Sequence, residues 1–439
     1  MTNTMEIREE ELVAGFDEEL LARLNDGPEW LCEARRAAFR RYAAIPLPTA
    51  RDEEWRRTDP ARFPFKDMTP MDRYDAAGAL TAGEWNAWFD VVATVEGDRY
   101  AIQDVSGVLA RKSLRVMTLA EAAEQYPERL SPYLQGQARG VPPGKYEALN
   151  EAFWTVGFFI DVPADTQLEK GILIRYINPP DGRIFMPRTI AVVGARSRVS
   201  MMEHFASADT ARFLSVTARE VYLDESSVMN LTSLQEWGKS VYHLSSDWGF
   251  VARAAKLNWV AMHFGGRVSK MLLGCDTAGE GAEAELDGMY IGTQKQHYDQ
   301  KTLQVHSAPK TYSNLLYKGA VKDKAYSVYQ GMIIARPGAN GVDAYQKNNN
   351  LVLDDGARAD SLPGLQIDTD DLKCSHGSTI GNLNEEEVFY LRSRGLNNDE
   401  ARKILLKGFF EEIVQKIPVE PVREKVRERI EEKMGSGGQ

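Results

Sequence analysis

Cys374 and His376 are separated by a single residue and carry side chains that bind soft and borderline metals. On an extended strand, residues i and i+2 project from the same face, so the thiol and the imidazole would stand side by side. Both groups are competent ligands for iron or zinc. Two ligands do not complete a metal site, and a free cysteine is more often a small buried apolar residue. The pair therefore indicates a metal site only if other ligands join it.

A second group of polar residues, His297, Asp299 and His306, lies in the run QKQHYDQKTLQVHSAP. These residue types could bind a metal or exchange protons. Buried histidines usually satisfy their ring nitrogens with hydrogen bonds, so we favour a structural role for both histidines.

Two other motifs, the P-loop and the CxxC pair, are absent from the sequence. No G-x-x-x-x-G-K-[ST] motif is present, so the chain carries no phosphate-binding P-loop. The three cysteines form no CxxC pair, and a stable iron–sulfur cluster normally needs four protein ligands. A cluster bound here would have to be completed by a partner.

Composition limits the partners and the compartment. The formal net charge of −11 over 439 residues argues against a nucleic acid or an anionic membrane as the main partner. The scattered, odd-numbered cysteines favour a reducing compartment. The acidic N-terminus lacks the features of a signal peptide, and no apolar run approaches about 18 residues. We therefore expect a cytoplasmic protein.

The candidate ligands follow a long region of strand-like sequence. Between residues 188 and 367, turns of small or polar residues alternate with runs of period 2, and the first few units begin about 25 to 30 residues apart. Each unit is too short to bury its own apolar face, which favours a stacked β-solenoid over a closed barrel. After Gly281 the spacing widens, and we expect residues 294–313 to be an insertion.

Helical patterns flank this region, at residues 8–44, from Leu119, and after residue 381. Asn384 with Glu387, and Asn397 with Glu400, have the spacing of helix-capping boxes. Gly395 suits the left-handed residue that ends a helix. Two apolar stripes at helical spacing follow. They comprise Ala401, Ile404, Leu405, Phe409 and Ile413, and then Val422, Val426 and Ile430.

These features together resemble a known family. The run KCSHGSTIG followed by NEEEVFYLRSRG, the upstream run beginning NLLYKGAVKDKAY, and the segment RDEEWRRTD (from Arg51) are similar to the SufB/SufD family of iron–sulfur cluster assembly proteins. The run around Cys374 looks like the SufD branch, because the SufB branch carries a V-E-H-E-A type run there. The resemblance covers residues 146–414 well and the N-terminal third loosely.

The resemblance implies a mostly β fold, a right-handed parallel β-helix core with helical regions at both ends. We expect an N-terminal helical and mixed region (1–145), the β-helix (146–380), a C-terminal helical domain (381–433) and a disordered tail (434–439). The end of the β-helix would pair with SufB, and His376 and Cys374 would contribute to a transient iron–sulfur cluster shared with it. The C-terminal helices would bind the ATPase SufC through Phe389, Leu405, Phe409 and Ile413.

The function this predicts is a non-catalytic scaffold subunit of the SUF complex that supports iron entry and cluster assembly; in isolation it could form a homodimer. Two alternatives stay open. One is a β-helix enzyme acting on a carbohydrate, which would need paired carboxylates and usually a secretory signal. The other is the SufB-type, cluster-bearing paralogue, although the context of Cys275 does not match the expected cluster-bearing cysteine.

Overall fold

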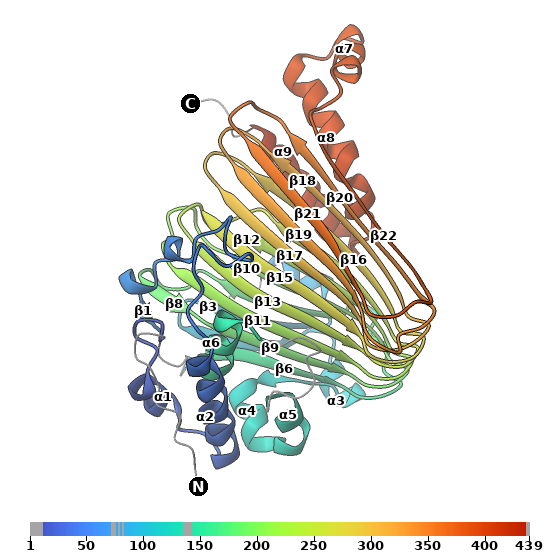
Figure 1. Ribbon diagram of the computed structural model, residues 1–439. Helices are drawn as coiled ribbons and strands as arrows, with labels where there is room; N and C mark the ends of the chain where they lie inside the picture. The colour runs from blue at the N-terminus through green and yellow to red at the C-terminus, as the bar shows by residue number, and fades with distance from the viewer. Residues whose placement is uncertain (1–11, 72–75, 78–79, 81–82, 135–142, 436–439) are drawn as a thin grey trace.

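Two long β-sheets face each other and form a parallel β-solenoid with helices at both ends of the chain (Figure 1). The computed structural model describes residues 12–71, 76–77, 80, 83–134 and 143–435. From residue 187 onward, consecutive strands alternate between the sheets, so each coil gives one strand to each sheet. The mostly β, β-helix fold expected from the sequence is confirmed.

The first sheet, sheet A, consists of β1 (Thr69–Pro70), β5 (Arg115–Thr118), β6 (Val156–Val162), β8 (Arg183–Phe185), β9 (Pro187–Val193), β11 (Leu214–Leu223), β13 (Tyr242–Val251), β15 (Val268–Thr277), β17 (His297–His306), β19 (Tyr326–Ala335) and β21 (Arg358–Ile367). The second, sheet B, consists of β2 (Ala76–Ala77), β3 (Val91–Glu96), β4 (Arg99–Asp104), β7 (Ile172–Ile177), β10 (Arg198–Ala206), β12 (Val228–Glu236), β14 (Lys256–His263), β16 (Glu283–Gly292), β18 (Tyr312–Val321), β20 (Val342–Val352) and β22 (Leu372–Gly381).

The coils repeat in close register. Lys256 pairs with Glu283, 27 residues later, and Tyr312 pairs with Asp343, 31 residues later. The expected insertion at residues 294–313 is wrong, because β17 occupies it and pairs along all ten of its residues with β15 and β19. The side chains of β17 that point into the solenoid carry polar groups although they are buried. The sequence of this strand therefore lacks the alternation of apolar and polar residues that predicts the other strands. The inward-pointing residues are Tyr298, Gln300, Thr302, Gln304 and His306.

Aromatic side chains fill the narrow interior between the sheets. Trp259, Tyr290 and Tyr317 are each no more than 1% exposed. Glycines face them where two side chains would collide. A Cβ added at Gly288 would lie 2.2 Å from the Tyr317 ring. Large and small residues therefore alternate between neighbouring coils, which keeps the core close-packed.

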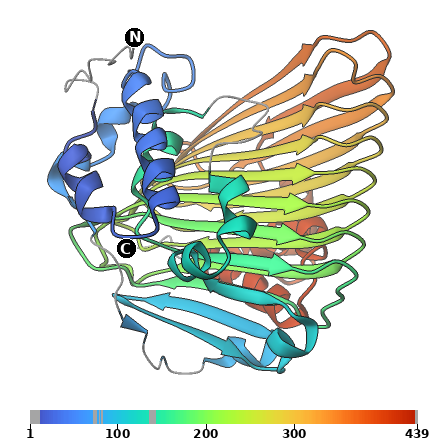
Figure 2. The same ribbon diagram turned by 90° about the horizontal axis from the view of Figure 1, so that it is seen from below.

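The two outer faces are covered by different helices. The N-terminal helices α1 (Glu18–Leu24) and α2 (Glu29–Ala44) and helix α6 (Lys145–Phe153) pack on sheet A, joined by α4 (Leu119–Gln125) and α5 (Pro127–Leu134). Helices α8 (Asn398–Val414) and α9 (Glu420–Gly435) pack on sheet B. Figure 2 shows the N-terminal helices and the C-terminal helices on opposite sides of the strands.

Most of the helix-capping residues predicted from the sequence are confirmed. Asn384 caps α7 (Glu385–Ser393) through the amide of Glu386, and the Asn397–Glu400 box is formed at α8, whereas no box forms with Glu387. Within the expected span 8–44, residues 8–11 lie outside the described part. Helix α9 runs through Gly435, so the expected start of a disordered tail at residue 434 is wrong; residues 436–439 lie outside the described part of the chain. None of the described helices is both long and apolar enough to cross a membrane.

Candidate functional site

The last coil leaves both sheets with an open edge. In the described part of the chain, β21 pairs only with β19 and β22 only with β20. Strand backbone without a neighbour is a ready template for pairing with another chain. Inward positions near this edge are apolar but solvent-exposed: Leu365 and Ile367 are 39% exposed and Ile380 is 48% exposed. The edge therefore has both free backbone and apolar surface to offer a partner.

Cys374 and His376 lie on β22 at this edge, on the same side of the strand. Their register partners on β20 are Ala344 and Gln346, which are buried inside the solenoid. Cys374 is half-buried against the apolar cluster around Ile333 and Ala344, while His376 is exposed. The strand therefore places the two side chains on the same face, as their spacing predicts.

The described residues contain no cluster of three or more histidine, cysteine, aspartate or glutamate side chains able to hold a metal ion. Burial raises the pKa of the Cys374 thiol above its ordinary value. Because the thiolate is the form that binds metals, this cysteine stays protonated at neutral pH until a metal or a cationic partner favours its ionisation. The pair can supply two ligands to a site that another chain completes.

Gln346 is a residue of this edge that sequence reasoning missed. It is 1% exposed, it lies beside His376 in the strand register, and neither its amide nitrogen nor its amide oxygen has a hydrogen-bond partner. The sequence signal that could have identified it is its position two residues after Ala344, because residues i and i+2 of a strand face the same side. The other two cysteines are remote from this site. Cys32 is in α2, and Cys275 is in the core, where burial raises its pKa.

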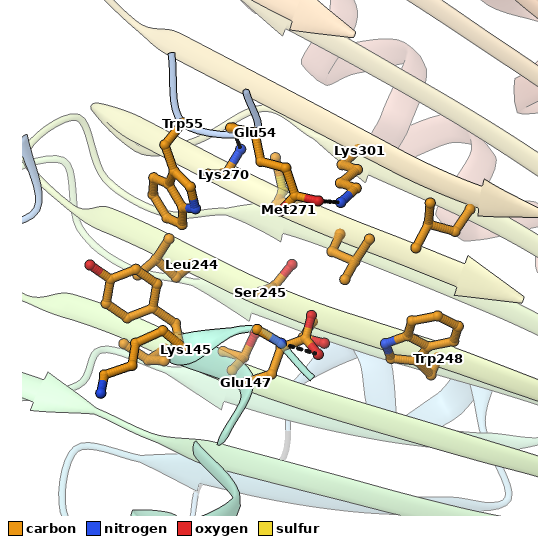
Figure 3. Close-up of a pocket in the computed structure, with 17 residues that line it drawn as sticks. Glu54, Trp55, Lys145, Glu147, Leu244, Ser245, Trp248, Lys270, Met271 and Lys301 are labelled. Atoms are coloured by element: carbon orange, nitrogen blue, oxygen red, sulfur yellow. Dashed lines mark hydrogen bonds and ion pairs between the residues drawn. The ribbon is translucent and has the colours of Figure 1, made fainter. Parts of the chain in front are cut away.

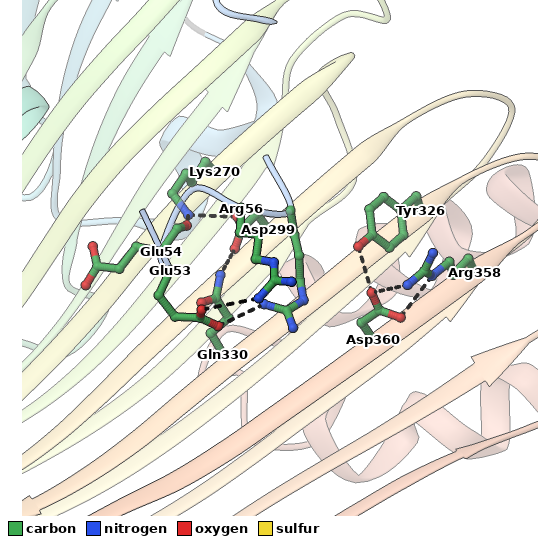
Figure 4. Close-up of polar contacts among 10 residues, drawn as sticks. Glu53, Glu54, Arg56, Lys270, Asp299, Tyr326, Gln330, Arg358 and Asp360 are labelled. Carbon is green, nitrogen blue, oxygen red and sulfur yellow. Dashed lines mark hydrogen bonds and ion pairs between the residues drawn. The ribbon is translucent and has the colours of Figure 1, made fainter. Parts of the chain in front are cut away.

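The sequence motif around His297 serves a different purpose. His297 Nε2 lies 2.8 Å from Thr58 Oγ1, and the same hydroxyl donates to Asp299 Oδ2 at 2.5 Å. Lys270 Nζ donates to Asp299 Oδ2 at 2.7 Å and to the carbonyl oxygen of Glu54 at 2.8 Å. Figure 4 shows the part of this network around Asp299, which accepts from both Lys270 and Gln330. The network attaches residues 51–59 to the sheet.

His306 is a buried core residue. Its Nδ1 lies 2.7 Å from Thr311 Oγ1 and 3.1 Å from Thr277 Oγ1, and its Nε2 lies 2.8 Å from Ser313 Oγ. Burial lowers the pKa of this imidazole to about 4. It is therefore neutral at physiological pH, and both of its nitrogens are hydrogen-bonded within the solenoid.

The residues expected to bind an ATPase partner differ widely in exposure. Phe389 on α7 is 71% exposed, whereas Leu405 and Phe409 on α8 are half-buried and Ile413 is fully buried. Figure 1 shows α7 projecting away from the sheets.

The buried face of α8 differs from the apolar stripe expected from the sequence. Ile404 is 46% exposed, and Leu406 and Phe410 face sheet B instead. The sequence offers apolar residues on two adjoining faces, and docking on the sheet selects one. The α9 stripe of Val422, Val426 and Ile430 is buried as expected.

Comparison with known proteins places this geometry in context. The family model described as "SUF system FeS cluster assembly, SufBD core domain" matches residues 176–409. An iron–sulfur cluster assembly SufBD family protein of Mycobacterium tuberculosis is 32% identical over 307 residues, covering 67% of this chain and 75% of the relative.

Other relatives span nearly the whole chain. A SufBD family protein of Synechocystis is 26% identical over 97% of this chain and 93% of its own. The iron–sulfur cluster assembly protein SufB of Bacillus subtilis is 23% identical over 92% of this chain and 89% of its own. The relatives therefore include a protein named SufB.

Proposed function

The chain belongs to the SufBD family of iron–sulfur cluster assembly proteins, and from that membership we propose that it is a non-catalytic, SufD-type scaffold subunit. The observation that carries the proposal is the open edge of the last coil, where Cys374 and His376 stand together without a third ligand among the described residues. The edge pairs with SufB, and the nascent cluster, which is the cargo of the reaction, forms between the two chains.

The C-terminal helices are the proposed contact for the ATPase SufC. Phe389 and Tyr390 on α7, which are 71% and 55% exposed, and Ile404 on α8 form the accessible apolar surface. Leu405 and Phe409 border it, whereas Ile413 supports it from within by packing on sheet B. The proposal therefore assigns direct contact to α7 and the exposed side of α8.

The SufB-type role is the alternative, because a relative of that name spans most of the chain. Two features favour the SufD type. The run around Cys374 has the SufD-like form, and Cys275, the only cysteine between residues 176 and 367, is 1% exposed in the core. A thiol there, with its pKa raised by burial, is a poor carrier of a cluster or of sulfur. Membership of this family gives no support to the alternative of a carbohydrate-active enzyme.

Reconstitution of the complex tests the cluster role. The chain is co-expressed with SufB and SufC and purified anaerobically, and cluster formation from iron and sulfide is followed by visible absorption. His376→Ala should reduce cluster formation at least about tenfold because an imidazole ligand or proton carrier is lost. Ser375→Ala, on the opposite face of the same strand, is the control and should behave as wild type. Equal cluster formation by His376→Ala and wild type would refute the assigned role.

Cys374→Ser separates a ligand from a packing residue. A ligand role predicts reduced cluster loading with unchanged thermal stability, whereas a packing role predicts the reverse.

Phe389→Asp should abolish co-elution with SufC while SufB binding persists.

The isolated chain should hydrolyse no ATP, and ATPase activity should appear only when SufC is added. ATP turnover by the chain alone would overturn the scaffold assignment.

A further inference from the structure

A cavity of about 160 Å³ lies on the outer face of sheet A, far along the fold from Cys374 and His376 (Figure 3). Three parts of the fold that are distant in sequence surround it. They are residues 54–55, the first turn of α6, and a group of neighbouring strands of sheet A, namely β11, β13, β15 and β17. Trp55, Tyr146 and Trp248 contribute aromatic rings, and Leu244, Leu272 and Leu303 add aliphatic surface. A concave, mainly apolar site with a few polar groups is the usual form of a small-molecule site.

The roof of this cavity is fixed before any ligand arrives. Lys270 binds both the carbonyl oxygen of Glu54 and the carboxylate of Asp299, and Lys301 forms an ion pair with Glu54. The Trp55 ring lies 5.2 Å from the Tyr146 ring and carries Lys270 Nζ 4.8 Å from its centroid. The floor is equally constrained, because a Cβ at Gly274 would lie 2.5 Å from the Trp248 ring that covers it.

Two buried hydrogen-bonding groups of the lining have no partner. Trp248 is 1% exposed and its indole nitrogen is unpaired; Ser246 is 6% exposed and its hydroxyl is unpaired. Figure 3 shows the indole nitrogen of Trp248 turned toward the other lining residues. An indole N–H can only donate, and a buried donor left without an acceptor is destabilising. Both groups would be satisfied by an acceptor in the cavity.

The charged side chains of the lining already have partners. Lys270 pairs with Asp299 and Lys301 with Glu54. Lys145 donates to the carbonyl oxygens of Tyr42 and Ile45, and Glu147 accepts from the backbone amide of Gly144 at the start of α6. None of these groups needs an ionic ligand as its partner. A volume of about 150 Å³ is enough to hold a benzene ring.

We infer that this cavity binds a small, neutral, planar heteroaromatic ring, which accepts hydrogen bonds from Trp248 and Ser246 and packs against the aromatic rings of the lining. The inference is independent of partner pairing, because none of the lining residues belongs to β21, β22 or the C-terminal helices.

Three ring probes of nearly equal shape test the inference in the full chain. Pyrazine has two ring nitrogens that accept hydrogen bonds, pyridine has one, and benzene has none. Binding is followed by the indole N–H resonances of the eight tryptophans, with the Trp248 resonance assigned by its loss in Trp248→Phe. Saturable binding in the order pyrazine, pyridine, benzene is expected, with a downfield shift of the Trp248 N–H only for the probes that carry nitrogen.

Variants then identify the donors. Ser246→Ala should weaken pyrazine binding about 3- to 10-fold, the loss of one hydrogen bond, and leave benzene binding unaffected. Ser200→Ala, on the outer face of sheet B, is the control and should leave all three affinities unchanged. Equal affinity for the three rings, no saturable binding, or binding that does not move the Trp248 resonance would each overturn the inference. Since the readout needs neither SufB nor SufC, its failure would not bear on the scaffold role.

Discussion

The two ends of the solenoid are built differently. At the N-terminal end, β4 runs antiparallel to β3 in sheet B, and β5 runs antiparallel to β6 in sheet A. The segment between them, which contains α3 (Val108–Lys112), closes the interior: Val108, Leu114 and Val116 are each no more than 5% exposed within the main core. At the C-terminal end, β21 and β22 end the two sheets, and Leu365, Ile367 and Ile380 remain at least 39% exposed.

The difference bears on which end is better suited to bind another molecule. Solenoids need a cap because unpaired edges promote association. This chain has a second set of helices that could cover the C-terminal end, yet α8 and α9 lie along the side of sheet B. Glu412 on α8 pairs with Lys318, and Arg429 on α9 pairs with Glu236, which secures both helices there. Among the described residues, the C-terminal end is therefore the one that combines unpaired strand edges with exposed inward-facing apolar side chains.

The largest expected effect is on the stability of the capped end. Phe158 on β6 is fully buried in the main core, so Phe158→Ala should lower the free energy of unfolding by about 3–5 kcal/mol. Ile380→Ala at the open end should change it by less than about 0.5 kcal/mol, because half of this side chain is already exposed. Chemical denaturation of the isolated chain measures both. Similar losses would contradict the difference between the ends.

A charge on each end sharpens the comparison for binding. Ile380→Lys should weaken association with SufB by about 10- to 100-fold, because burying a charge without a partner is costly. Val105, near the capped end, is 45% exposed against 48% for Ile380 and so provides a matched control. Val105→Lys should leave the affinity unchanged in titration calorimetry. An equal effect of the two substitutions would mean that the open edge is not the contact.

The attachment of α9 to the side of the solenoid should depend on pH. Lys433 is 9% exposed and donates to Gln296 Oε1, and burial lowers its pKa to about 7. Arg429 and Lys239 lower this pKa further, whereas Asp209 and Glu236 raise it.

Between about pH 7 and about pH 10.5, the unfolded chain therefore binds more protons at this residue than the folded chain does. Stability should rise with pH across this window by up to about 1.4 kcal/mol per unit relative to Lys433→Met. Denaturation at several pH values checks the difference between the two proteins. Parallel pH dependences would show that Lys433 stays charged in the fold.

The smallest expected effect separates the helix on the sheet from the helix that projects. Asn397→Ala removes the formed capping box of α8 and should cost about 1 kcal/mol of global stability, because α8 is part of the packed side. Asn384→Ala removes the cap of α7, which projects from the fold, and should fray that helix without a global loss. Hydrogen exchange distinguishes local fraying from global unfolding, and a global loss in Asn384→Ala would contradict this assignment.

Local rules predicted much of this molecule correctly from the sequence. The alternation of strands, the repeat of about 25 to 30 residues, the same-face placement of Cys374 and His376, the cap at Asn397 and the α9 stripe all depend on neighbours within a few residues or one coil. Such features are set by the period of the strand or helix and by turn chemistry, which a sequence displays directly.

Other features depended on residues that the sequence places far apart. The polar inward face of β17 reads as a loop until neighbouring coils supply partners such as Thr277 and Ser313 for His306. Thr58 meets His297 across 239 positions, and the cavity at Trp248 exists only because residues 54–55 fold over sheet A. Burial and hydrogen bonding decide whether a polar residue belongs to a core, and both are properties of the assembled fold rather than of the local chain.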